Sequence, residues 1–167
     1  MILVAIGANL PRPDGGTPFE SCKAAAAAVR AIPGLTFVAL SPWYRTVPTP
    51  RTDQPEYCNG MIRLEGEIDP LMLLSRLHEI EQDFGRVRGE PNAARTLDLD
   101  IVDLNGIIRA VPDPVLPHPR AHLRPFVLRP LLDVAPGWRH PVLRQSVTTL
   151  LAELPPQTMN LWGEDEI

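Results

Sequence analysis

Two acidic residues, Asp98 and Asp100, lie one position apart in the segment RTLDLDIV. Side chains of a β-strand alternate between its two faces, so a strand here would place both carboxylates on one face. The apolar residues that alternate with them would point into the core: Leu97, Leu99 and Ile101. Neighbouring carboxylates repel unless a cation lies between them, and Mg²⁺ binds one or two carboxylates together with substrate phosphates. The pair therefore favours a magnesium site for phosphoryl transfer, and a strand with acids on its wet face is the structural alternative.

Three arginines, Arg86, Arg88 and Arg95, fall within a span of ten positions just before the two acids. A guanidinium binds phosphate oxygens in a bidentate manner, so arginines beside paired carboxylates are typical of a triphosphate site. A solvated basic loop is the alternative. We expect residues 87–94 to be mobile in the free protein and to close over the substrates, because the segment offers almost nothing apolar to anchor it. We also expect the three arginines to lack acidic partners until phosphates arrive.

The bulk composition is that of an ordinary globular protein. The chain has 167 residues, 44% of them apolar, and a net charge of −4. This length predicts one domain over residues 1–167, and the charge provides no basic field for nucleic acid or an anionic membrane. No run reaches transmembrane length, and the two cysteines show no metal-binding spacing. We therefore expect a cytoplasmic protein with neither nucleic-acid nor membrane partners.

The spacing of apolar residues, together with prolines, glycines and capping residues, predicts the strands and helices that must position these side chains. Strands are expected at 2–6, 35–40 with an extension to Tyr44, 57–65 and 96–104. Helices are expected at 19–32 and 69–85, followed by shorter ones near 127–134 and 142–154. The order βαββαβ predicts a ferredoxin-like α+β fold, with a mostly antiparallel sheet, both core helices on one face and C-terminal helical additions.

Four segments, in order and at fitting separations, resemble the 6-hydroxymethyl-7,8-dihydropterin pyrophosphokinase (HPPK) family. They are AIGANL from Ala5, YRT from Tyr44 with DQPEYCN from Asp53, GRVR from Gly85 with RTLDLDI from Arg95, and PHPR from Pro117 with RPFVLRPL from Arg124. The resemblance covers nearly the whole chain. It implies a ferredoxin-like fold and the transfer of pyrophosphate from Mg-ATP to the hydroxymethyl group of the pterin in folate biosynthesis. The products would be AMP and the pterin diphosphate.

The same resemblance implies the residues of the site. Two Mg²⁺ ions arriving with ATP would be held by Asp98 and Asp100, and these two residues would be catalytic together with Arg86 and Arg95. The implied pterin-binding residues are Thr46, Val47, Tyr57, Asn59, Asp98 and Phe126. The implied ATP-binding residues are Leu74, His78, Glu81, Arg86, Arg88, Arg95, Ile101, His118 and Arg124. The partners would be ATP and 6-hydroxymethyl-7,8-dihydropterin, and a monomer is expected.

The chain also departs from the family pattern. Many members carry a tryptophan in the loop before Arg95, where this chain has Asn92 and one residue fewer. Asp113 lies where some members have a further arginine, and Pro125 replaces a small residue.

Two other functions fit parts of the same pattern. A metal-dependent phosphohydrolase could use the acidic pair without a pterin. A non-catalytic ferredoxin-like ligand-binding module could share the fold, but it has no need for arginines beside the acids. Formation of AMP that depends on the pterin would separate the three.

Overall fold

The computed structural model describes residues 1–46, 55–86 and 96–162. Its centre is a six-stranded sheet in which every pairing is antiparallel, in the order β5-β1-β4-β3-β6, with β2 also paired to β4. The strands are β1 Ile2–Ala8, β2 Leu35–Leu40, β3 Tyr44–Thr46, β4 Tyr57–Gly66, β5 Asp98–Leu104 and β6 Met159–Leu161. The helices are α1 Pro18–Arg30, α2 Pro70–Asp83, α3 Pro125–Val134 and α4 Val147–Ala152, with a 3-10 turn, η1, at Ala121–Leu123. The ferredoxin-like α+β fold expected from the sequence is confirmed.

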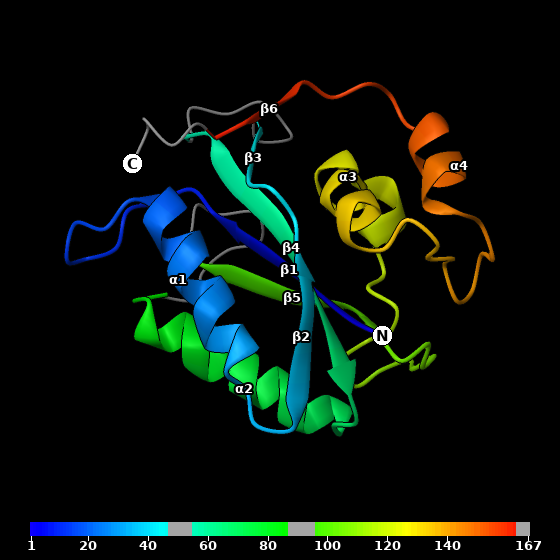
Figure 1. Ribbon diagram of the computed structural model, residues 1–167, viewed down its shortest axis with the longest axis horizontal. Helices are drawn as coiled ribbons and strands as arrows, with labels where there is room; N and C mark the ends of the chain where they lie inside the picture. Colours follow the sequence, from blue (N-terminus) through cyan, green and yellow to red (C-terminus); the bar gives the residue numbers. More distant parts are fainter. Residues whose placement is uncertain (47–54, 87–95, 163–167) are drawn as a thin grey trace.

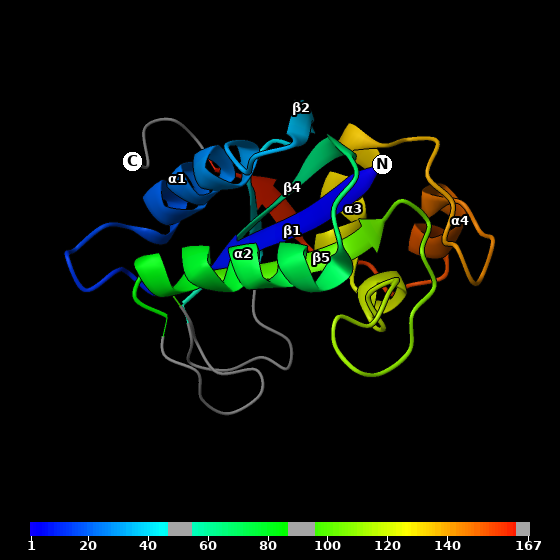
Figure 2. The same ribbon diagram turned by 90° about the horizontal axis from the view of Figure 1, so that it is seen from below.

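The sheet lies between two helical layers, as Figures 1 and 2 show. Apolar side chains of α1 and α2 pack with Val4 and Ile62 on one face. Side chains of α3 and α4 pack with Leu3 and Met61 on the other face. Successive side chains along β1 and β4 therefore point in turn into the two cores. The expected placement of α1 and α2 on one face of the sheet is correct.

The second predicted strand is divided into β2 and β3, and both parts pair with β4. Pro42 lies at the break and has no N–H to donate to a ladder. Ser41 holds the chain to β4 at this point, because its N–H donates to the Met61 carbonyl at 2.9 Å and its Oγ accepts the Met61 N–H at 2.9 Å. The predicted extension to Tyr44 is therefore real, but it is displaced along β4.

The C-terminal third differs most from expectation. The predicted helix at 142–154 is wrong at its start, since α4 begins only at Val147. Before it, His140 Nδ1 accepts the N–H groups of Val142 at 3.2 Å and Leu143 at 3.0 Å, which holds the chain in a turn. Ser146 then caps α4 by accepting the Thr149 N–H at 3.3 Å. Strand β6, whose three residues pair with β3, was not expected from the sequence.

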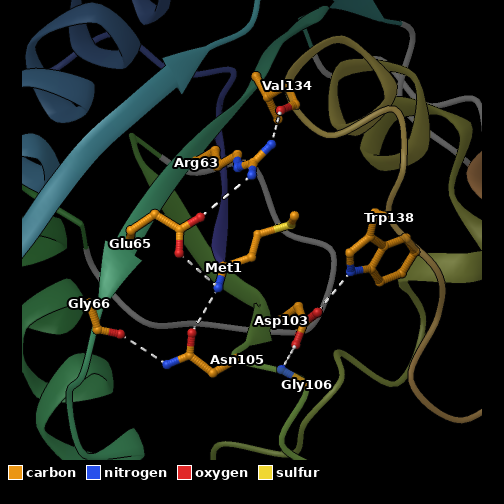
Figure 3. A network of polar contacts seen from close by, with 9 residues as sticks. All are labelled: Met1, Arg63, Glu65, Gly66, Asp103, Asn105, Gly106, Val134 and Trp138. Atoms are coloured by element: carbon orange, nitrogen blue, oxygen red, sulfur yellow. Dashed lines mark hydrogen bonds and ion pairs between the residues drawn. The ribbon is translucent and has the colours of Figure 1, made fainter.

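A polar network secures one end of the sheet (Figure 3). The Met1 amino group donates to Asn105 Oδ1 at 2.8 Å and pairs with Glu65 at 3.1 Å. Asp103 accepts hydrogen bonds with both carboxylate oxygens, from Trp138 Nε1 at 2.7 Å and from the Gly106 N–H at 2.9 Å. The Trp138–Asp103 bond anchors the segment after α3 to β5. Among the described residues, no helix is long and apolar enough to cross a membrane.

Candidate active site

Four strands bring one residue each into a single row across the sheet. Asp98 on β5 pairs with Gly7 on β1, Gly7 pairs with Asn59 on β4, and Asn59 pairs with Tyr44 on β3. Directly paired residues project from the same face. This is the face covered by α3, because Asn59 and Met61 are two positions apart on β4 and Met61 packs against α3. Asp98 and Asn59 are two strand spacings apart, or roughly 10 Å, with Gly7 between them.

Gly7 has no side chain, which lets the Asn59 side chain lie close against the middle of this row. A Cβ atom at this position would lie 2.8 Å from Asn59 Oδ1, closer than side chains tolerate. A glycine inside a strand often marks such a close approach. The first strand, expected to end at Ile6 just before Gly7, continues to Ala8, and the role of Gly7 was not expected from the sequence. Its position within an otherwise apolar strand was the available signal.

Asp98 and Asp100 project from one face as the alternation predicts, while Leu97, Leu99 and Ile101 are buried in the opposite core. Burial, followed by the negative charge of Asp98, raises the pKa of Asp100 to about 7, although the positive charge of Arg124 opposes this. The Asp100 side chain keeps 35% of its surface exposed, so it remains reachable from solvent. A pair of carboxylates that resists carrying two charges would gain from a bound cation, and hard oxygen donors fit Mg²⁺.

Arg86 has acidic partners, so the expectation that it would lack them is wrong. Its guanidinium forms an ion pair with Glu81 and another with Asp98, the latter at 3.0 Å. Glu81 is 2% exposed and also accepts the Leu99 N–H at 2.9 Å, which ties α2 to β5. The end of α2 and the start of β5 meet at this point. Glu81 and Leu99 are 18 positions apart in the sequence, so their contact was not predicted. Arg86 thus neutralises part of the acidic cluster.

His118 lies on the other side of Asp100, with Nε2 at 3.9 Å from Asp100 Oδ2. Its Nδ1 accepts the Arg120 N–H at 3.1 Å, which leaves the proton of a neutral ring on Nε2. Burial, together with the positive charges of Arg124 and Arg120, lowers the pKa of His118 to about 4. The ring is therefore a neutral hydrogen-bond donor that faces the carboxylates at physiological pH.

The residues expected around the pterin lie further along the same face. Asn59 Nδ2 donates to Thr46 Oγ1 at 2.6 Å, and both side chains are buried. Tyr57 pairs with Thr46 in the next row of the sheet. Phe126 lies in the first turn of α3, and the Arg124 guanidinium carbon is 5.6 Å from the centre of its ring. Arg124 thus lies between the acidic cluster and Phe126.

Other expected residues lie elsewhere or outside the described residues. Leu74 packs against the core between α1, α2 and the sheet, and Ile101 is part of that core, on the face away from Asp98. His78 lies on α2 between Leu74 and Glu81. Val47, Arg88 and Arg95 fall outside the described residues, as does the whole of the segment 87–94 for which mobility and closure are expected. Within the described ranges, no group of three or more His, Cys, Asp or Glu side chains could hold a metal ion, so a metal here would depend on the two aspartates and its substrate.

Comparisons with known proteins show which family the chain resembles. The sequence profile of 7,8-dihydro-6-hydroxymethylpterin-pyrophosphokinase (HPPK) matches residues 3–136. The chain is 39% identical over 154 residues to 2-amino-4-hydroxy-6-hydroxymethyldihydropteridine pyrophosphokinase of Pseudomonas aeruginosa, which covers 92% of this chain and 91% of the relative. The protein of the same name from Haemophilus influenzae is 37% identical over 132 residues, covering 79% of each chain. Folic acid synthesis protein fol1 of Schizosaccharomyces pombe is 33% identical over 160 residues, which cover 96% of this chain but 21% of that one.

A solved structure described as HPPK-DHPS in complex with substrates has a TM-score of 0.61 and 13% sequence identity. The match covers 90% of this chain and 44% of that one, and at this identity it supports the fold alone. The profile match and the bacterial relatives, each of which the chain covers for most of its length, show that this chain belongs to the HPPK family.

Proposed function

We propose that the sheet face carrying Asp98, Asp100 and Asn59 is where this chain performs the reaction of its family. The chain is a pyrophosphokinase that transfers pyrophosphate from ATP to 6-hydroxymethyl-7,8-dihydropterin in folate biosynthesis, and its family depends on Mg²⁺. One observation supports the proposal: the row from Asp98 through Gly7 to Asn59 sets a carboxylate and a carboxamide about 10 Å apart on one face of the sheet, with no side chain at the glycine between them.

The pterin would lie at the Asn59 end of the row. A carboxamide has both donor and acceptor atoms, so Asn59 can pair with the donor and acceptor edge of a pterin while Thr46 holds its orientation. Phe126 and Tyr57 would contribute aromatic surfaces on which the ring can stack. Val47 and Asp98 complete the proposed pterin-binding residues. In this pose the hydroxymethyl group points along the row toward Asp98.

The phosphates would lie at the Asp98 end. We propose that Asp98 and Asp100 hold two Mg²⁺ ions, which would supply positive charge to the triphosphate when bound. His118 would donate from Nε2 to a phosphate oxygen, and Arg86 would exchange Asp98 for a phosphate group. The further ATP-binding residues proposed are His78, Glu81, Arg88, Arg95 and Arg124. Leu74 and Ile101 are proposed from the resemblance alone, because their side chains pack in the core on the opposite face of the sheet.

The proposed chemistry is attack of the hydroxymethyl oxygen on the β-phosphorus of ATP, with AMP as the leaving group. Positioning and electrostatic stabilisation by Arg86 and Arg95 would supply most of the rate enhancement. Asp98 is the best candidate to accept the hydroxyl proton, because it lies at the boundary between the two substrate sites. We also propose that residues 1–167 form one catalytic domain that acts as a cytoplasmic monomer.

Product analysis tests the function. The purified protein is incubated with Mg-ATP, with and without 6-hydroxymethyl-7,8-dihydropterin, and AMP, ADP and phosphate are quantified by chromatography. A pyrophosphokinase forms AMP and pterin diphosphate in equal amounts, and only when the pterin is present. Phosphate release without pterin would indicate a phosphohydrolase, and no turnover under either condition would indicate a binding module.

A further inference from the structure

Helix α3 carries Phe126 and is held to the sheet by two hydrogen bonds from different strands. Near its end, Arg63 Nη1 on β4 donates to the Val134 carbonyl at 3.1 Å (Figure 3). One residue earlier, the Tyr44 hydroxyl on β3 donates to the Asp133 carboxylate. The first bond reaches backbone and holds the end of the helix. The second reaches a side chain, so it also constrains how the helix is rotated about its axis.

Asp133 and Phe126 lie on the same side of α3. They are seven residues apart, which is close to two helical turns, so their side chains project in nearly the same direction. Arg129 lies between them on this side, and its Nη2 is 3.9 Å from Asp133 Oδ1. A contact that fixes the direction of Asp133 therefore fixes the direction of Phe126 two turns earlier.

Tyr44 belongs to the opposite wall of the same site. It is 6% exposed, pairs directly with Asn59 across the β3–β4 ladder, and lies two positions before Thr46 on the same face. Thr46 in turn accepts the hydrogen bond from Asn59 at 2.6 Å. The Tyr44–Asp133 bond therefore connects the strand that orients Asn59 to the helix face that presents Phe126.

We propose that Tyr44 and Asp133 are positioning residues of the pterin site, whose hydrogen bond sets the rotation of α3 and hence the placement of Phe126 opposite Asn59 and Thr46. The proposal rests on the proposed function, because it takes Phe126, Asn59 and Thr46 as the walls of the pterin site. Neither Tyr44 nor Asp133 would touch the pterin. Their effect would be on how well a ring fits between the walls, and not on the phosphates at Asp98.

The bond is built to persist across the physiological pH range. Burial, followed by the hydrogen bond to Asp133 and the charge of that carboxylate, raises the pKa of Tyr44 to about 12, while Arg129 acts in the opposite direction. The phenol therefore stays protonated and remains a donor. A hydrogen bond that does not change with pH in this range is suited to positioning α3 and not to switching it.

The experiment combines substitutions on both sides of the bond. Tyr44→Phe removes the donor and Asp133→Ala removes the acceptor, while Asp133→Asn keeps an acceptor oxygen. We measure kcat, the KM for pterin, the KM for ATP, and pterin affinity by fluorescence in the presence of a non-hydrolysable ATP analogue and Mg²⁺.

Loss of one hydrogen bond to a charged group should raise the pterin KM and Kd by about 5- to 20-fold, with kcat and the ATP KM changed less than about 2-fold. The double variant Tyr44→Phe/Asp133→Ala should show about the same loss as either single variant, because both remove the Tyr44–Asp133 bond and the exposed Arg129–Asp133 pair contributes little. Asp133→Asn should recover most of the pterin affinity.

Trp138→Phe is the matched control, since it also removes one buried hydrogen bond from an aromatic side chain to an aspartate, here Asp103. It should lower thermal stability to a similar extent as Tyr44→Phe and leave the pterin KM unchanged. The proposal is overturned if Tyr44→Phe leaves the pterin KM and Kd within about 2-fold of wild type, or if it shifts the KM of both substrates equally. Failure of the proposed function is distinguishable, because wild-type protein would then form no AMP in a pterin-dependent manner, whatever the variants do.

Discussion

Asp100→Asn should stabilise the protein at neutral pH when neither Mg²⁺ nor nucleotide is present. The folded chain raises the pKa of Asp100 from 3.8 to about 7, mainly through burial and the charge of Asp98. Between these two values the folded state holds a proton that the unfolded state has released. The stabilising contribution of this group is therefore fully present below about pH 4 and is lost as the pH rises to about 7. An asparagine does not titrate, so the variant escapes this loss.

The size of the effect follows from the pKa shift and the exposure of the side chain. A shift of about three units corresponds to about 4 kcal/mol in the free energy of unfolding. The Asp100 side chain is 35% exposed, and water screens its interaction with Asp98, so the realised effect is smaller. We expect Asp100→Asn to gain on the order of 1–2 kcal/mol above pH 7.

Urea unfolding in the presence of EDTA measures this difference, from about pH 5 to about pH 8. The gap between variant and wild type should widen as the pH rises through about 7 and level off near about pH 8. Asp103→Asn is the control on the same strand. It should lower stability throughout this pH range, because both Asp103 oxygens accept hydrogen bonds and an amide group can replace only one of them. The reasoning is refuted if Asp100→Asn is less stable than wild type at about pH 8, or if the gap does not change with pH.

Three further predictions concern binding and turnover. Gly7→Ala should raise the pterin KM at least about tenfold with a smaller effect on the ATP KM, because the new methyl group displaces the Asn59 side chain; equal changes in both KM values would contradict this. Glu81→Gln should lower kcat and lower the free energy of unfolding in urea by about 1–3 kcal/mol, because it removes the buried charge that holds Arg86. An unchanged unfolding midpoint would show that the ion pair does not stabilise the fold. Calorimetry should detect pterin binding only after Mg²⁺ and an ATP analogue are added, because the acceptor site is completed by the first substrate, and equal affinity without them would exclude this coupling.

The features that the sequence predicted well depend on local periodicity. The two-residue period of a strand was enough to place Asp98 and Asp100 on one face and Leu99 in the core. Pro70 and the helical spacing of Leu73 and Leu77 likewise located α2. Such patterns involve neighbouring residues, so they can be read without knowing which elements pair.

The features that it missed depend on pairings between distant segments. The role of Gly7 exists only because the β1–β4 register places it beside Asn59. Tyr44 and Asp133 are 89 positions apart, and only the packing of α3 on the sheet brings them into contact. β6 is three residues long and gains its partner from β3. No local pattern encodes these contacts, because strand pairing and helix placement are decided by the whole fold.

The most direct test of the central claim is a crystal structure of the complex with Mg²⁺, a non-hydrolysable ATP analogue and 6-hydroxymethyl-7,8-dihydropterin. The account predicts a pterin ring above Gly7, paired with Asn59 and adjacent to Phe126, with metal ions bound by Asp98 and Asp100. A pterin bound on the α1–α2 face of the sheet, or a triphosphate without contact to the metals at Asp98 and Asp100, would contradict it.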